Sequence, residues 1–285
     1  MSDADFTIPL DSLPERFAES LDRPSGEVAV PYPAATVVLL REGAHGVEVL
    51  LLKRVGSAGF VPGAYVFPGG RVDGEDATPA LVARLDGLTE EEATQRLGTT
   101  TDADPPAVAY YVAAIREAFE ETGILIGKDA EGHAPRSAAV DPRMRVLKQE
   151  LLGNDQAFPS VLDRMGCRMD AGVVEYVGHW ITPEAEPRRY DTRFFAALVP
   201  PGQDPHVDER EMTEAIWITP EEALRKNRAG ELPMVFPTLR TLASLTGFLT
   251  PRGALDAFHE RDIPTVLPRL VRTPTGVGIE VDEEG

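Results

Sequence analysis

The sequence predicts an α/β protein in which a mixed β-sheet lies between layers of helices, an α/β/α sandwich. β-rich runs and helical segments are mixed along the chain, which is typical of this architecture. With 285 residues, of which 42% are hydrophobic and 26% are charged, the chain is long enough to bury a substantial core. The clearest helix carries an apolar stripe at helical spacing, formed by Val108, Val112, Ile115 and Phe119.

Each remaining element follows from a local pattern. Two β-rich runs flank the glycine-containing segment 42–46 and predict a hairpin. Thr219 followed by Pro220 predicts a helix start, because threonine caps and proline suits the first turn. We expect strands at 34–40, 47–53, 64–67, 124–126, 171–180, 192–199 and 215–218. We expect helices at 13–21, 141–152, 160–165, 219–228 and 232–260, the last with breaks at Pro237 and Pro251.

These elements predict one main domain with additions. The acidic segment 77–105 interrupts it, and Thr89 has capping-box spacing to Glu92, which predicts a small helix there. This insertion is expected at the surface, as a lid or a dimer contact, and the extra helices would allow a homodimer. The expected parts are an N-terminal extension (1–30), the main domain (31–230) with a helical cap (140–166), a C-terminal helical segment (231–272) and a tail (273–285).

Net charge, apolar runs and cysteine content limit the kinds of partner and location that we expect for this protein. The net charge of −19 argues against generic binding to nucleic acid or to an anionic membrane. No apolar run reaches transmembrane length, and the acidic N-terminus lacks the pattern of a signal peptide. Cys167 is the only cysteine, so no intramolecular disulfide forms and a buried structural thiol is expected. A cytoplasmic location fits these features, and the C-terminus lacks the peroxisomal tripeptide.

The best-defined helix carries the most informative cluster of charges. Glu117, Glu120 and Glu121 stand at i, i+3 and i+4, which places them on one helix face. Like charges at this spacing repel, so a bound divalent cation is the simplest compensation. The alternative is a solvated acidic face. We favour the cation because the helix is sharply delimited, with Asp104 as the expected N-cap and Gly123 as the stop.

Two stretches of sequence resemble a known motif. Residues 116–124 read Arg-Glu-Ala-Phe-Glu-Glu-Thr-Gly-Ile, and residues 67–76 read Phe-Pro-Gly-Gly-Arg-Val-Asp-Gly-Glu-Asp. Together they resemble the Nudix box, G-x5-E-x7-R-E-U-x-E-E-x-G-U, in which U is aliphatic. Two departures stand out. Asp76 occupies the place of the first glutamate, with Glu75 one residue early, and about 40 residues separate Glu75 from Arg116.

The interrupted motif is itself informative. The chain is similar to the Nudix hydrolases with a split box, the branch that contains the mammalian peroxisomal coenzyme A diphosphatase. Such enzymes hydrolyse a diphosphate linked to another group, with Mg²⁺ or Mn²⁺. The resemblance implies that Glu117, Glu120, Glu121 and the Gly70 carbonyl ligate the metal and that Arg116 orients a box glutamate. Similar stretches at 51–54, 60–63, 180–183 and 188–195 extend the resemblance over roughly residues 30–250.

Other roles remain open at this point. Glu209 or Glu211 is the expected general base, because the family often takes it from a loop outside the box; a solvated loop is the alternative. Gly69 and Gly70 suit close approach of metal and phosphate to the main chain. Arg54, Arg189 and Phe194 are candidate substrate contacts. Arg188, Arg189 and Arg193 could equally be surface residues that flank a strand. Phe194 and Phe195 point to opposite faces of a strand, so at least one of them is expected in the core. His179 and His206 are expected to be satisfied or solvated.

The resulting hypothesis is a metal-dependent hydrolase of a small diphosphate substrate, with coenzyme A or an acyl-coenzyme A first. ADP-ribose, a nucleotide sugar or NADH is the alternative within the class. A Nudix fold kept as a ligand-binding module without catalysis is the alternative of another class, which the departure at Asp76 favours and the set Arg116, Glu117, Glu120 and Glu121 disfavours.

Overall fold

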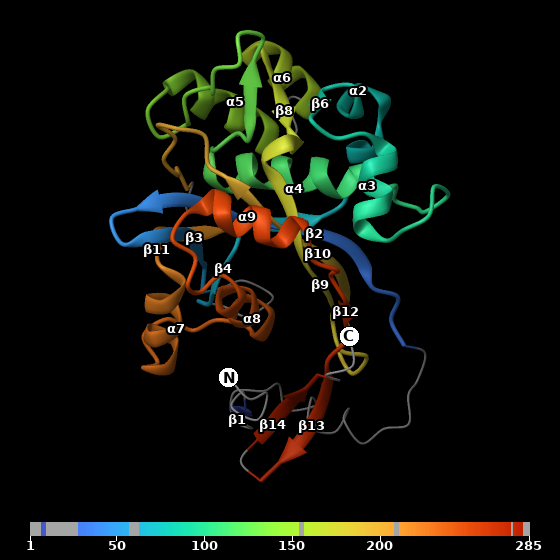
Figure 1. Ribbon diagram of the computed structural model, residues 1–285, viewed down its shortest axis with the longest axis vertical. Helices are drawn as coiled ribbons and strands as arrows, with labels where there is room; N and C mark the ends of the chain where they lie inside the picture. Colours follow the sequence, from blue (N-terminus) through green and yellow to red (C-terminus); the bar gives the residue numbers. More distant parts are fainter. Residues whose placement is uncertain are drawn as a thin grey trace.

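The computed structural model describes residues 7–9, 28–56, 63–153, 157–207, 211–274 and 276–281. The helix expected at 13–21 lies outside these ranges. An eight-stranded mixed sheet crosses the molecule in the order β11-β3-β2-β10-β9-β12, with β4 on β3 and β5 on β2 (Figure 1). Its strands are β2 (Tyr32–Gly43), β3 (Gly46–Arg54), β4 (Tyr65–Val66), β5 (Gly69–Arg71), β9 (Val174–Ile181), β10 (Tyr190–Leu198), β11 (Met212–Ile218) and β12 (Thr265–Val266).

The sheet is built around β2, which is buried on both faces. Val37 to Leu40 are all fully buried, as expected for a central strand with helices on either side. Val37 and Leu39 face one hydrophobic core, whereas Val38 and Leu40 face the other. β2 pairs in parallel with β10 and antiparallel with β3, so the predicted hairpin is confirmed.

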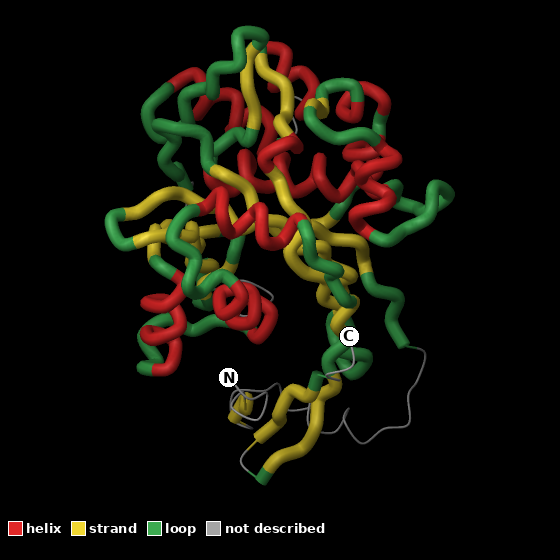
Figure 2. The backbone as a smooth tube through the Cα atoms, in the orientation of Figure 1, coloured by secondary structure: helices red, strands yellow, loops and turns green. Residues whose placement is uncertain are grey.

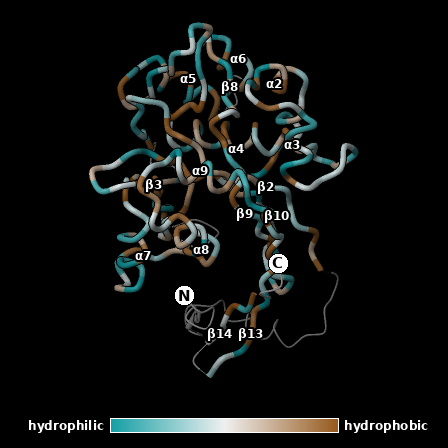
Figure 3. The backbone as a smooth tube through the Cα atoms, in the orientation of Figure 1, coloured by the Kyte–Doolittle hydropathy of each residue, from teal (hydrophilic) through white to brown (hydrophobic). Residues whose placement is uncertain are grey.

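Helices cover both faces, which confirms the predicted sandwich. Figure 2 shows helices above and below the strands, and Figure 3 shows hydrophobic residues along α4 and the neighbouring strands. α4 (Ala107–Thr122) belongs to the first core, with α5 (Pro142–Leu152) and α6 (Phe158–Met165) beyond it. The second core includes α7 (Pro220–Arg228), α8 (Phe236–Ser244) and α9 (Pro251–His259).

The ends of α4 fix the position of its acidic face. Gly123 ends the helix in the left-handed conformation, with φ 69°, as predicted. The expected Asp104 cap is wrong: Pro106 is the N-cap residue, and no side chain caps the helix. The strand begins later than expected, because β7 spans Gly127–Asp129 while residues 124–126 are buried without strand pairing.

The insertion is tied to the helical cap through a small sheet. η3 (Gly74–Ala77) leads into the insertion, which contains α2 (Pro79–Val82), β6 (Leu85–Asp86) and α3 (Glu90–Leu97). The capping box of Thr89 and Glu92 is present as predicted. β6 pairs with β8 (Cys167–Asp170), which in turn pairs with β7. The 3₁₀ turn η4 (Ala171–Val173) then replaces the start of the strand expected from residue 171.

The C-terminal region differs most from expectation. Pro237 and Pro251 lie in the first turns of α8 and α9 rather than at breaks. The expected tail contains β14 (Gly276–Glu280), which pairs with β13 (Arg269–Thr273) and β1 (Thr7–Pro9), so both ends of the chain meet in a three-stranded sheet (Figure 1). Among the described residues, no helix combines the length and apolar character that a membrane span requires.

Candidate active site

Two glycines bring strand β5 close to the acidic face of α4. Gly70 lies against Glu117: a Cβ added at Gly70 would stand 2.6 Å from the Glu117 Cδ. The backbone N–H of Gly69 donates to Glu121 Oε2 at 3.2 Å. A side chain at Gly69 would collide with the Ala35 carbonyl at 2.5 Å. Glycine is therefore required at position 69, where a side chain would meet backbone, whereas a side chain at position 70 would displace the Glu117 carboxylate.

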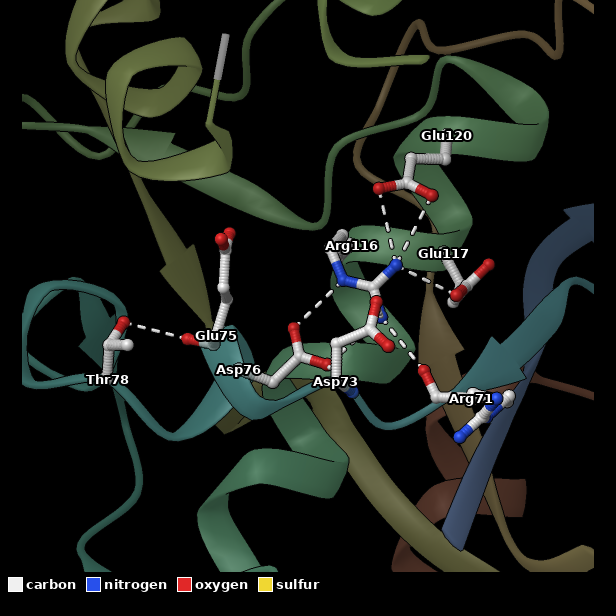
Figure 4. A network of polar contacts seen from close by, with 8 residues as sticks. All are labelled: Arg71, Asp73, Glu75, Asp76, Thr78, Arg116, Glu117 and Glu120. Atoms are coloured by element: carbon white, nitrogen blue, oxygen red, sulfur yellow. Dashed lines mark hydrogen bonds and ion pairs between the residues drawn. The ribbon is translucent and has the colours of Figure 1, made fainter. Parts of the chain in front are cut away.

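Arg116 is the hub of the polar network beside these glycines (Figure 4). Its Nε and Nη2 donate to the two oxygens of Asp76 at 2.8 and 3.0 Å, a bidentate pair. Its Nη1 donates to Glu117 Oε1 at 2.8 Å and to Glu120 at 3.2 Å. Its Nη2 also reaches the Arg71 carbonyl. One guanidinium thus joins the two halves of the split box and orients two of the three glutamates.

Asp76 occupies this network despite its shorter side chain. It is fully buried, and its Oδ2 accepts a second hydrogen bond from the Asp73 N–H at 2.8 Å. That bond belongs to the capping box of η3, which sets Asp76 at the depth of the Arg116 guanidinium. The departure at position 76 therefore retains an acidic partner for Arg116.

The network shifts the ionisation of its members. Burial alone would lower the pKa of Arg116, but the hydrogen bonds that it donates to Asp76 and the charges of Glu117, Asp76 and Glu120 raise it above its usual value. Burial raises the pKa of Glu117 to about 7, although Arg116 opposes this. Burial likewise raises the pKa of Glu120, and it raises the pKa of Glu121 well above its usual range, helped by the charge of Glu117. Ionisation of the three buried glutamates is therefore unfavourable in this site, and a bound cation would make it more favourable.

The donor chemistry fits a hard divalent cation. Three carboxylates and nearby main chain offer the oxygen ligands that Mg²⁺ and Mn²⁺ prefer. As they stand, however, no three such side chains among the described residues converge on one point. Glu117 and Glu120 are instead directed to Arg116, and Glu121 to the Gly69 N–H. A cation would therefore replace some of these hydrogen bonds.

Two further predicted residues lie near Glu121. The positive charge of Arg54 lowers the pKa of Glu121, and the negative charge of Glu211 raises it. The Arg54 Nε is buried without a hydrogen-bond partner among the described residues. The Glu211 carbonyl accepts from the Val55 N–H at 2.9 Å, which ties the start of β11 to the end of β3. Glu209 lies outside the described residues.

Two predicted substrate residues serve the fold instead. Arg189 is 5% exposed, and its guanidinium donates to the Thr182 and Ala29 carbonyls at 3.0 and 2.9 Å. Phe194 is 6% exposed and belongs to the core on the sheet face opposite α4, while Phe195 belongs to the core beneath α4. The guanidinium of Arg189 is held by two main-chain carbonyls, and Phe194 lies in the core opposite α4; substrate contact by either residue stays a prediction.

The histidine expectation is confirmed for His179. Its Nε2 pairs with Asp191 Oδ1 at 2.6 Å, and its Nδ1 is hydrogen-bonded to the Thr265 hydroxyl at 2.8 Å. Arg193 donates to the same Asp191 oxygen. This cluster joins β9, β10 and β12, so it holds the edge of the sheet together.

The structure also places one residue that sequence analysis missed. Lys148 of α5 is fully buried, and its Nζ donates to the carbonyls of Glu121 and His206 at 3.2 and 2.6 Å. The His206 N–H in turn donates to the Thr122 carbonyl at 2.6 Å. Lys148 thus binds the end of α4 to the segment that precedes Glu211. Sequence analysis did not single out Lys148, although it lies on the same helix face as the buried Met144, Leu147 and Leu151.

Comparison with known proteins identifies the family. The model described as the NUDT19 Nudix domain matches residues 26–245, which is most of the chain. The chain belongs to the NUDT19 Nudix-domain family. It is therefore a Nudix hydrolase by family, and the split box is the form in which this family's motif occurs here.

Individual relatives agree with this family. The chain is 28% identical over 229 residues to "Acyl-coenzyme A diphosphatase NUDT19" of Xenopus laevis, covering 70% of this chain and 60% of that protein. It is 29% identical over 259 residues to the protein of the same name from Gallus gallus, covering 75% and 68%. Thus the chain spans about two thirds or less of the length of these relatives.

The fold of this chain is similar to that of a solved structure. The crystal structure of a Nudix hydrolase from Alicyclobacillus acidocaldarius is similar with a TM-score of 0.67 and 29% sequence identity. The match covers 80% of this chain and 96% of that chain. The NUDT19 Nudix-domain assignment and the sandwich fold are therefore consistent with each other.

Proposed function

We propose that this protein is a metal-dependent hydrolase that cleaves the diphosphate of coenzyme A or of an acyl-coenzyme A. The observation that carries the proposal is the Arg116 network, in which Asp76, Glu117 and Glu120 converge on one guanidinium beside Gly69 and Gly70. A module that only bound ligand would have no need for buried like charges at this density. The names of the relatives supply the substrate class.

Glu117, Glu120 and Glu121, with the Gly70 carbonyl, would hold Mg²⁺ or Mn²⁺. When bound, such an ion neutralises phosphate charge and lowers the pKa of a water molecule. Arg116 keeps Glu117 and Glu120 pointed toward the glycine loop and makes no contact with substrate. The buried Asp76 holds Arg116 in turn, which fixes the guanidinium beside the carboxylates.

The remaining roles rest on position and charge. Glu211, or Glu209, would act as the general base by accepting the proton of the attacking water, because Glu211 lies close enough to Glu121 to raise its pKa. Arg54 would pair with a phosphate oxygen of the substrate, which would satisfy its buried Nε. Cleavage adds water across the P–O–P bridge and yields adenosine 3′,5′-bisphosphate and a phosphopantetheine.

Product analysis tests this assignment against its alternatives. The protein would be incubated with Mg²⁺ or Mn²⁺ and coenzyme A, acetyl-coenzyme A, ADP-ribose, NADH or a dinucleoside polyphosphate, and the products resolved by mass. Adenosine 3′,5′-bisphosphate from the first two substrates alone is the expected result. AMP from ADP-ribose or NADH would instead assign a nucleotide-sugar or dinucleotide substrate. No product from any substrate would favour the non-catalytic module.

A further inference from the structure

Two tyrosine rings lie beside the glycine loop of the candidate active site, on the sheet face opposite α4. Tyr32 begins β2 and is 45% exposed, whereas Ala34, two residues later on the same strand face, is buried. Tyr190 is the register partner of Tyr32 on the parallel strand β10, and the two ring centroids are 6.3 Å apart. Tyr190 is half-buried, so both rings reach the surface of the sheet here.

The side chain of Arg71 covers one of these rings. Its guanidinium carbon stands 4.1 Å from the centroid of the Tyr32 ring, which is a cation–π contact. Arg71 is exposed, and its guanidinium makes no ion pair with any residue that the structure describes. One flat face of the guanidinium therefore lies on Tyr32, while the opposite face is open to a ligand.

The backbone of Arg71 ties these side chains to the candidate active site. Its carbonyl accepts from Arg116 Nη2 at 3.0 Å, while its side chain is directed away from the Arg116 network and lies beside β2 (Figure 4). In β5, Gly70 faces Glu117 and the next residue, Arg71, faces Tyr32. Among the described strands β5 pairs only with β2, so its second edge is free of other strands. Consecutive Cα atoms are about 3.8 Å apart, so one small molecule can contact both faces around this edge.

A planar aromatic ring joined to a phosphate is the ligand chemistry that fits these side chains. Nucleobases stack on tyrosine rings and on guanidinium planes, and every base offers such a flat face. A phosphate alone would pair with Arg71 but leave the rings of Tyr32 and Tyr190 unused. A cationic ligand would be repelled by Arg71. A nucleotide uses the rings, the guanidinium plane and the positive charge together.

We propose that Tyr32, Arg71 and Tyr190 form a stacking platform for the adenine base of the substrate. The base lies on the open face of the Arg71 guanidinium, which Tyr32 supports from behind, and the ring of Tyr190 extends the surface. The diphosphate then lies around the edge of β5, on the side of Gly70. The identity of the ligand as an adenine nucleotide rests on the proposed function. The platform holds the nucleoside and takes no part in the cleavage of the diphosphate.

Ligand binding tests the platform without turnover. AMP and ribose 5-phosphate differ only in the base, and each would be titrated into the full chain with Mg²⁺ by ligand-observed NMR. We expect AMP to bind about tenfold more tightly, because only AMP stacks. Saturation transfer from the protein should also reach the H2 and H8 protons of adenine. Equal affinities, or no saturable binding of AMP, would overturn the proposal.

Matched variants assign the binding to these side chains. Tyr32→Ala should weaken AMP about tenfold and leave ribose 5-phosphate unchanged, whereas Tyr32→Phe retains the ring and the affinity for AMP. Arg71→Gln should weaken AMP about fivefold or more, because it removes the guanidinium plane and its charge. Arg261→Gln is the control, since Arg261 is also exposed and lies 4.9 Å from the centroid of the Phe258 ring. If Tyr32→Ala and Arg71→Gln bind AMP as wild type does, the platform is wrong.

Kinetics with coenzyme A separate this inference from the proposed function. Tyr32→Ala should raise KM about tenfold with little change in kcat, because the base is remote from the cleaved bond. A wild-type protein that cleaves no diphosphate but binds AMP through Tyr32 and Arg71 would support the platform and refute the hydrolase. A wild-type protein that cleaves coenzyme A, with KM unchanged in both variants, would refute the platform alone.

Discussion

At the scale of single residues, Asp76 explains how the box tolerates its main departure. The motif position was recognisable from sequence, but the shorter acid weighed against catalysis. Its partner Arg116 lies 40 positions away in the chain, and no local pattern reveals that the η3 turn buries Asp76 against it. Both partners are buried, so removal of either one should destabilise the fold strongly.

Asp76→Asn should therefore lower the free energy of unfolding by about 3 kcal/mol, since removal of one partner from a buried ion pair leaves the other uncompensated. Arg116 retains Glu117 and Glu120, which holds the loss at the lower end of the usual range. Urea denaturation measures the change. Asp73→Asn is the control, because Asp73 is 64% exposed and should change stability little. Similar losses in both variants would contradict the structural role of Asp76.

Gly70→Ala tests the close approach of strand and helix. The added Cβ would stand 2.6 Å from the Glu117 Cδ, so the carboxylate must move. We expect Mn²⁺ affinity and turnover to fall at least tenfold with a small change in melting temperature. Gly74→Ala adds a methyl group with nothing within 4 Å and serves as the control. Unchanged Mn²⁺ binding in the Gly70 variant would remove Glu117 from the ligand set.

The raised pKa of Glu117 predicts the pH dependence of metal binding. Burial raises this pKa to about 7, above the ordinary value of 4.5 that applies in the unfolded chain. Without metal, the contribution of Glu117 to the free energy of unfolding is therefore fully present below pH 4.5 and is lost as pH rises through 7. Protons compete with the cation, so Mn²⁺ affinity should rise between about pH 5.5 and 8.

Calorimetry in two buffers of different ionisation enthalpy measures that competition. We expect proton release on Mn²⁺ binding at pH 6 and much less at pH 8. Release that is absent at both values would contradict protonation of the glutamates at pH 6.

At the scale of elements, local patterns predicted the longer strands of the main sheet and most helices, but not the short strands β5, β6, β8 and β12. The hairpin of β2 and β3, the capped helix α7 and the insertion helix α3 each carry their own signal in turn or cap residues. The hairpin of β13 and β14 was missed because the end of the chain was interpreted as a tail, and its second partner, β1, lies at the other end of the chain. The role of the buried Lys148 was missed because its acceptors are backbone carbonyls of distant segments. Every residue has such a carbonyl, so the identity of the residues does not reveal the contact.

Lys148 supplies the prediction at this scale. Lys148→Met removes the donor to the Glu121 and His206 carbonyls, and we expect about 2 kcal/mol of lost stability. Since the His206 segment leads to Glu211, kcat should fall more than KM rises. Arg145→Met, an exposed position on the same helix, is the control. A stability loss without any change in kcat would confine Lys148 to a structural role.

At the scale of the whole molecule, the α/β/α sandwich and the acidic helix face followed from the sequence, whereas the surroundings of the site did not. Arg189 and Phe194 were candidate substrate contacts by residue type, but residue type alone does not say which side chains are buried. Arg54 and Glu211 gained support only from their position near Glu121. Whether such a side chain is buried or lies near Glu121 depends on contacts between segments that are distant in sequence.

The central claim is that the acidic face of α4 is the metal centre for diphosphate cleavage. The most direct test compares wild type with Glu121→Gln, using coenzyme A and Mg²⁺, with products resolved by mass and folding checked by circular dichroism. We predict adenosine 3′,5′-bisphosphate and phosphopantetheine from wild type, no cleavage once the metal is chelated, and no product from a folded Glu121→Gln. Equal cleavage by the two proteins, or cleavage that survives chelation, would contradict the account.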